Sequence, residues 1–211
     1  MNIIKAEQIE EKSFKIIDSE IGPTHFTEQE YVIVRRVIHA TGDFDFAQNM
    51  KFHPHAIAAG MEALKKGKNI LVDVRMVEAG IKKKALARLG CTTVCLIDSD
   101  EVAEKAREEK KTRSETAMQM GLTEDVGIVV IGNAPTALLK VIEIVQNAHT
   151  GAPVPELIIG VPVGFVNAVE SKDELAALDH PFITSSGRKG GSSIAAAIVN
   201  ALLGLVGTGS V

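Results

Sequence analysis

Residues 126–148 read VGIVVIGNAPTALLKVIEIVQNA, a pattern that indicates the fold class. Residues 126–131 are apolar without the polar alternation of a half-exposed strand, so we expect a strand that is buried on both faces. A turn rich in Gly, Asn and Pro follows, and residues 136–148 fit a helix. A buried strand that leads through a short turn into a helix is the repeating unit of a parallel sheet.

The same unit recurs after residue 70. Short β-branched runs predict strands at 70–74, 93–97, 126–131, 157–161 and 182–184, with helices at about 82–89, 101–120, 136–148, 171–178 and 192–203. We therefore predict an α/β fold with a doubly wound, mainly parallel sheet of about five strands.

The first third of the chain is helical in pattern and forms an N-terminal extension to that sheet. One helix is expected over residues 6–21, and a third runs from Pro54 to Gly67. Between them, a capping box of Thr27 and Glu30 opens a helix that continues to about Ala40, with Gly42 as its stop. No linker or repeat interrupts the chain, so we expect one domain over residues 1–211.

Composition excludes several classes of function. The chain has 23 basic and 27 acidic residues, 4% aromatic residues and no Trp. Nucleic-acid binding is not expected, because it usually requires a basic excess or aromatic stacking surfaces. No apolar run is long enough to span a membrane, and the N-terminus lacks the apolar core of a signal peptide. We expect a cytoplasmic protein in which Cys91 and Cys95 are reduced core thiols.

The ligand of such a sheet lies beyond the C-terminal ends of its strands. The segments there are 73–76, 98–99, 132–136, 162–165 and 185–193. The last of them, SSGRKGGSS, joins a strand to an apolar helix, so backbone N–H groups, a helix N-terminus and two cations converge. This pattern favours an anion site over the alternative of a flexible loop with solvated charges.

Other polar residues admit two interpretations each. His39 lies near the end of the second helix with Arg36 one turn earlier. Histidine is the usual acid–base residue, yet a lone His at a helix end is more often a capping or core residue. Asp73 can be a ligand or a loop cap, and residues 112–114 (Thr-Arg-Ser) a ligand or a solvated helix face. The His-Pro-His sequence at 53–55 lacks a third ligand, so we predict no metal site there.

Motifs for nucleotides and for serine nucleophiles are missing. The sequence has no P-loop, no Gly-x-Gly-x-x-Gly after its first strand and no Gly-x-Ser-x-Gly. We therefore expect no dinucleotide and no nucleophile-elbow chemistry.

Taken together, these segments resemble the precorrin-8X methylmutase family, including its cobalt-precorrin-8 members. The resemblance runs in order over nearly the whole chain. It rests on Ser13-Phe14-x-Ile-Ile, Arg35-Arg36-Val37-Ile38-His39-Ala40-x-Gly42, Asp73-x-x-Met76-Val77, Thr112-Arg113-Ser114, Gly132-Asn133-Ala134-Pro135-Thr136-Ala137-Leu138, Gly160-Val161-Pro162-Val163-Gly164-Phe165-Val166, Glu170-Ser171-Lys172-Asp173 and Gly187-Arg188-x-Gly190-Gly191-Ser192.

The resemblance implies an isomerase of cobalamin biosynthesis. Such an enzyme moves a methyl group from carbon 11 to carbon 12 of (cobalt-)precorrin-8 and gives cobyrinate or hydrogenobyrinate. It implies no separate cofactor, a corrinoid as ligand, a homodimer and a cytoplasmic location. The catalytic histidine of the family, a proton donor and acceptor, falls on His39. Substrate contacts fall on Ser13 and Arg36, and Arg113 and the 187–192 loop are also expected to line the pocket.

The residue types fit this substrate, an apolar ring edged with carboxylates. Such a ring needs a broad cleft with cations at its rim, where charge-assisted hydrogen bonds form. The expected substrate-binding set is Ser13, Arg36, Arg75, Arg113, Gly187, Arg188, Lys189, Gly190, Gly191 and Ser192. At Lys189 we expect Leu in members of the aerobic pathway, and we favour the cobalt-containing substrate.

Two other functions compete with this one. The 187–193 loop also suits an α/β enzyme that acts on a phosphate ester, and the fold also suits a tetrapyrrole carrier without catalysis. The first should be stabilised by nucleotides or sugar phosphates, and the second should leave the spectrum of the pigment unchanged.

Overall fold

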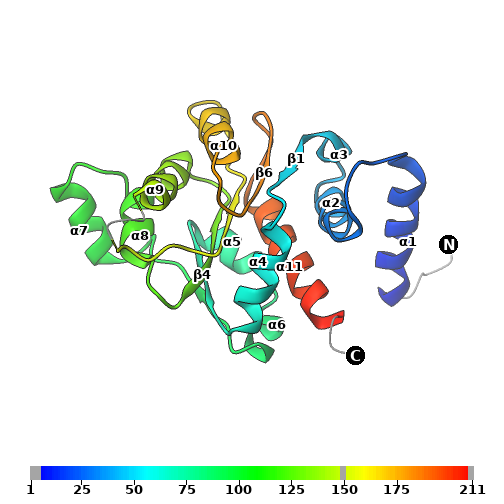
Figure 1. Cartoon of the computed structure of the whole chain (residues 1–211), viewed down its shortest axis with the longest axis horizontal. Coiled ribbons are helices and arrows are strands. Elements are labelled where there is room, and N and C mark those ends of the chain that lie inside the picture. Colours follow the sequence, from blue (N-terminus) through cyan, green and yellow to red (C-terminus); the bar gives the residue numbers. More distant parts are fainter. Residues whose placement is uncertain (1–5, 148–150, 209–211) are drawn as a thin grey trace.

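The centre of the molecule is a six-stranded sheet with the strand order β1-β6-β5-β4-β2-β3 (Figure 1). It is seen in a computed structural model that describes residues 6–147 and 151–208. The strands are β1 (Met50–Phe52), β2 (Asn69–Val72), β3 (Thr93–Val94), β4 (Val126–Ile131), β5 (Leu157–Gly160) and β6 (Phe182–Ser185). Strands β2 to β6 are parallel, and β1 pairs antiparallel with β6. The predicted α/β fold with a mainly parallel sheet is confirmed.

Helices cover both faces of the sheet. They are α1 (Ala6–Glu20), α2 (Glu28–Thr41), α3 (Phe46–Asn49), α4 (Ala56–Lys65), α5 (Arg75–Gly80), α6 (Lys83–Arg88), α7 (Asp100–Glu108), α8 (Arg113–Gly121), α9 (Pro135–Gln146), α10 (Ala168–Ala176) and α11 (Ser192–Thr208). Alternate residues of β4 point to different cores: Ile128 and Val130 pack with α2, α4 and α11, and Val129 and Ile131 pack with α8, α9 and α10. Because both faces of the strand are buried, its sequence shows no polar alternation.

The N-terminal helices end as the sequence indicates. The Thr27 Oγ1 accepts the Glu30 N–H at 3.3 Å, and the Glu30 carboxylate accepts the Thr27 N–H at 2.8 Å, so the capping box is confirmed. Gly42 has φ +66° and donates its N–H to the carbonyl of Ile38, which ends α2. Helix α2 packs on α11, and α1 packs on the outer side of α2 (Figure 1).

Several elements differ from the expectation. The helix expected over 101–120 is two helices, because Lys110 has a left-handed φ of +54° and Thr112 caps a new helix through the Glu115 N–H. The helix expected from Pro54 begins at Ala56. Strand β1 was not expected, since three residues are too few to show a period. The end of the helix expected over 136–148 lies outside the described residues.

Within the described residues, no helix is both long enough and apolar enough to cross a membrane.

Candidate active site

The loops at the C-terminal edge of the sheet come together as the parallel topology requires. Asp73, directly after β2, is fully buried and accepts the N–H groups of Gly132 at 3.0 Å, Asn133 at 2.7 Å and Ala134 at 2.9 Å. Burial raises the pKa of this carboxyl group, and the three N–H groups oppose that effect. Asp73 therefore acts as a brace of the β4–α9 turn. Of the two interpretations of Asp73, this is the loop cap and not the ligand.

The β4–α9 turn in turn lies against the start of α11. A Cβ atom on Gly132 would stand 2.7 Å from Cγ2 of Val77 and 2.9 Å from the Cα of Ser192, so only glycine fits there. The segments after β2, β4 and β6 are thus in contact. This agrees with the expectation that ligand-binding loops share one edge of the sheet.

The loop from Ser185 to Ser192, called here the anion loop, is fixed against the end of β5. The Gly191 N–H donates to the carbonyl of Val161 at 2.8 Å, and the Gly164 N–H donates to the carbonyl of Arg188 at 3.3 Å. The guanidinium of Arg188 lies 5.3 Å from the ring centre of Phe165. The anion loop is therefore held by its backbone, and Arg188 remains exposed.

Lys189, also in the anion loop, is already paired. Its Nζ lies 2.6 Å from a carboxylate oxygen of Asp43 and 2.6 Å from one of Asp45, in the segment between α2 and α3. These two carboxylates raise the pKa of Lys189. Lys189 thus ties the anion loop to the C-terminal end of α2, the end where His39 lies.

His39 belongs to a cluster between α1 and α2. Its ring meets that of Phe14 edge-on with centroids 5.2 Å apart, and the guanidinium of Arg36 lies 4.8 Å from the same ring. Arg36 forms two hydrogen bonds, of 2.9 and 3.0 Å, with the carboxylate of Glu10, and this pairing lowers the pKa of Glu10. Ser13 precedes Phe14 on α1, and its hydroxyl donates to the carbonyl of Ile9. His39 is half-buried.

The remaining predicted residues lie away from this cluster. Arg75, at the start of α5, pairs with Glu78 and Asp98, each at 2.9 Å. Arg113 is the first residue of α8. The hydroxyl of Thr112, which caps this helix, lies 3.0 Å from the hydroxyl of Thr136, so the start of α8 lies beside the β4–α9 turn. Among the described residues, neither Arg113 nor Arg188 forms an ion pair.

One chain does not bring every predicted residue together. Helices α7 and α8 lie at one end of the long axis of the molecule, and α1 lies at the other (Figure 1). Helix α8, which begins at Arg113, is therefore far from α1, which carries Phe14, whereas Lys189 joins the anion loop to the end of α2.

Sequence reasoning missed two features of this edge. Phe165 and Val166, in the β5–α10 loop, are 83% and 78% exposed, which is unusual for large apolar side chains. Lys172, on α10, is buried and donates from Nζ to the carbonyl of Lys189 at 2.8 Å. The first was readable from the apolar pair between Gly164 and Asn167. The second was not, because a lysine in a charged helix suggests solvent.

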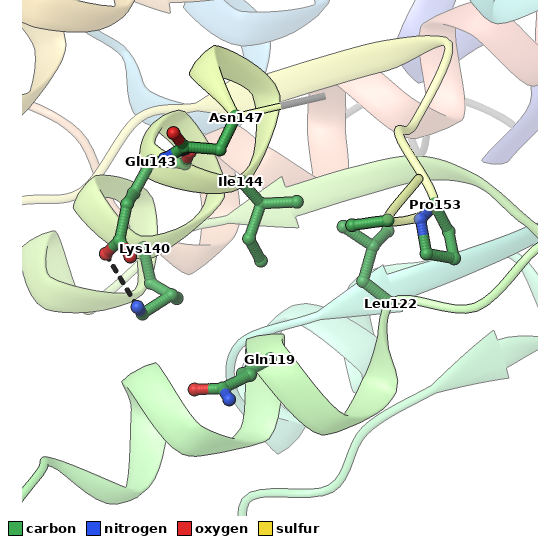
Figure 2. Close-up of a pocket in the computed structure, with 8 residues that line it drawn as sticks. Gln119, Leu122, Lys140, Glu143, Ile144, Asn147 and Pro153 are labelled. Atoms are coloured by element: carbon green, nitrogen blue, oxygen red, sulfur yellow. Dashed lines mark hydrogen bonds and ion pairs between the residues drawn. The ribbon is translucent and has the colours of Figure 1, made fainter. Parts of the chain in front are cut away.

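A separate cavity of about 280 Å³ lies between α8 and α9, away from all of these residues. Figure 2 shows Leu122, Ile144 and Pro153 on its walls, with Lys140 paired to Glu143 at 2.6 Å. None of the predicted site residues lines it.

The residues that the structure describes contain no group of three or more potential metal ligands. His53 and His55 have ring centres 5.5 Å apart, and the His53 Nδ1 accepts the His55 N–H just before α4.

Comparisons with known proteins all indicate one family. The sequence model of precorrin-8X methylmutase matches residues 8–205. The chain is 45% identical to a cobalt-precorrin-8 methylmutase of Priestia megaterium, over 98% of this chain and 91% of that protein. It is 41% identical to a precorrin-8X methylmutase of Pseudomonas aeruginosa, over 93% and 94%. The crystal structure of precorrin-8X methylmutase from Thermus thermophilus superposes with a TM-score of 0.87 at 41% identity, covering 98% of both chains.

Proposed function

Because the chain belongs to the precorrin-8X methylmutase family and is therefore an isomerase that shifts a methyl group in cobalamin biosynthesis, we propose that His39 is its acid–base residue. The observation that carries this assignment is the cluster around Phe14, where His39 and Arg36 meet the same ring. Phe14 holds the imidazole edge-on, Arg36 lies over the same Phe14 ring, and Ser13 precedes Phe14 on α1.

For this reaction the protein has to orient the substrate ring and to supply one proton. A protonated His39 donates a proton to the conjugated ring, the methyl group migrates from carbon 11 to carbon 12, and the ring returns the proton. Substrate and product have the same atoms, so neither a donor nor a further cofactor is part of the proposal. General acid catalysis of this kind typically contributes about 10²–10⁴-fold.

Cations at the edge of the sheet bind the carboxylates of the ring. Arg113 and Arg188 have no carboxylate partner among the described residues, so they gain a charge-assisted bond outright. Arg36, Arg75 and Lys189 must exchange a protein carboxylate for one of the substrate. Backbone N–H groups at Gly187, Gly190 and Ser192 add neutral donors, whereas the N–H of Gly191 is already used by the carbonyl of Val161. The exposed Phe165 and Val166 offer an apolar surface to the ring.

A homodimer is part of the proposal. Helix α8, which begins at Arg113, and helix α1, which carries Phe14, lie toward opposite ends of the molecule (Figure 1), so a second copy that supplies one of them would let a single ring contact both. Light scattering should give the mass of two chains, and the mass of one chain at micromolar concentration contradicts the dimer.

We also place the enzyme in the cytoplasm and treat residues 1–211 as one domain. The main core supports the single domain, because it runs from Ile17 on α1 to Val206 on α11.

The cobalt-containing ring is the preferred substrate in this proposal. The relative from Priestia megaterium, named for the cobalt form, is 45% identical, and the one from Pseudomonas aeruginosa, named for precorrin-8X, is 41% identical. Parallel turnover of cobalt-precorrin-8 and precorrin-8 tests this preference, and faster turnover of the metal-free ring contradicts it.

The decisive experiment is incubation with either ring, followed by absorbance and mass. An isomerase changes the first and leaves the second unchanged. Binding without a change in absorbance identifies a carrier, and stabilisation by sugar phosphates but not by corrinoids identifies a phosphate-ester enzyme.

A further inference from the structure

Lys172 is a buried cation that the proposed chemistry does not use. It lies on α10, is 1% exposed, and its Nζ donates to the carbonyl oxygen of Lys189 at 2.8 Å. Within residues 6–147 and 151–208 it forms no ion pair, and Asp173, on the same helix, is the charged group that acts on it. Burial lowers the pKa of Lys172 to about 8.

Stability does not account for this residue. An ammonium that leaves water without a carboxylate partner loses hydration that one carbonyl only partly replaces. Replacing a buried charge by an apolar side chain of similar shape is often neutral or stabilising. A Met at position 172 would fill the same space without that cost. The role of Lys172 therefore lies in the part of the chain that its ammonium contacts.

That contact sets the orientation of one peptide unit in the anion loop. The carbonyl of Lys189 accepts two hydrogen bonds from the interior, one from Lys172 and one from the Ser185 hydroxyl at 3.1 Å. The described residues have no cis peptide bond, and in a trans peptide the C=O and the following N–H point in opposite directions. With the Lys189 carbonyl turned inward, the Gly190 N–H faces outward.

The outward N–H stands in the anion loop itself. Gly190 has no room for a side chain, since a Cβ atom would collide with the carbonyl oxygen of Val161. Its N–H makes no hydrogen bond to the described residues, whereas the next N–H, that of Gly191, is used by Val161. An N–H without a hydrogen-bond partner, two positions from the cation Arg188, is suited to a carboxylate.

We propose that Lys172 is a positioning residue for substrate binding: its buried ammonium holds the Lys189 carbonyl inward and so presents the Gly190 N–H to a carboxylate of the ring. This inference rests on the proposed function, because it names the substrate carboxylate as the group that the N–H meets. Lys172 itself does not touch the substrate.

The test separates position from stability. Corrinoid product is titrated by absorbance into the wild type, Lys172→Met and the matched control Ser185→Ala, which removes the neutral donor to the same carbonyl. Lys172→Met should weaken binding about tenfold, as expected for a hydrogen bond with a charged partner, and Ser185→Ala about threefold. The melting temperature of Lys172→Met should equal or exceed that of the wild type.

A pH series adds a readout that a purely structural role would not move. Affinity of the wild type should fall as pH rises through about 8, where the Lys172 ammonium becomes neutral, and that of Lys172→Met should stay flat there. Asp173 is the charged group that acts on Lys172, and the hydrogen-bond partner of Lys172 belongs to Lys189, whose own ammonium is turned to Asp43 and Asp45.

Three outcomes overturn the inference. Lys172→Met that binds product as tightly as the wild type ends it while leaving the proposed function intact. A loss of melting temperature in Lys172→Met and also in Lys172→Gln, which keeps a neutral donor, shows a structural role instead. Wild-type protein that binds no corrinoid overturns the proposed function, and this inference with it.

Discussion

Replacing Asp73 by Asn tests the brace that shapes the site edge. The carboxylate accepts three backbone N–H groups, with Gly132 on one oxygen and Asn133 and Ala134 on the other. An Asn side chain has one acceptor oxygen, so its amide NH₂ must face at least one of these N–H groups. The protein loses one hydrogen bond to a charged acceptor and leaves a buried donor unpaired, a cost of about 3 kcal/mol.

Urea unfolding followed by circular dichroism measures this cost. The matched control is Asp98→Asn, because Asp98 is exposed, follows the neighbouring strand β3 and, among the described residues, pairs only with Arg75. That surface pair should contribute less than about 1 kcal/mol. If the free energy of unfolding of Asp73→Asn lies within about 1 kcal/mol of the wild-type value, the brace does not hold the β4–α9 turn and the reasoning is refuted.

Three further predictions concern function and pH. His39→Ala should reduce single-turnover isomerisation by about 10²–10⁴-fold and keep product affinity within about tenfold; near-normal turnover returns His39 to a packing role. Arg113→Ala and Arg188→Ala should each weaken product binding by about 1.5–3 kcal/mol, and Arg88→Ala on α6 should not, as titration will show. Between pH 8 and about 10.5 the Lys172 side chain is protonated more often in the unfolded state than in the folded state. The free energy of unfolding of the wild type should therefore rise with pH in this range, by up to about 3 kcal/mol relative to that of Lys172→Met. Parallel stability curves of the two proteins would contradict the last of these.

The fold was predictable from the sequence wherever burial fixed the pattern. Strand β4 is apolar at all six positions because α9 covers one face and α11 the other, and that pattern survives in the sequence. Strand β1 was not predictable, since its three residues pair at the edge with β6 and show no period. The break between α7 and α8 was hidden as well, because Lys110, which takes the left-handed conformation there, rarely does so.

The candidate site was predictable in its location and less so in its contacts. The resemblance named His39 and the anion loop, and the parallel topology brings the loops after β2, β4 and β6 together. Ion pairs between distant segments left no trace in the sequence: Lys189 and Asp43 are 146 positions apart. Lys172 was missed for the same reason, since its partner is a backbone carbonyl 17 positions away.

The pairing of the rim cations decides how much each contributes to binding. Lys189 lies 2.6 Å from two carboxylates, so a substrate carboxylate gains only the difference between old and new partners there. Arg188 has an exposed aromatic ring beside it and no carboxylate among the described residues, so its full interaction is open to the ligand. The affinity for the ring should therefore depend more on Arg188 than on its neighbour Lys189. The pairing with Asp43 and Asp45 leaves Lys189 a different task, which is to hold the anion loop at the end of α2, near His39.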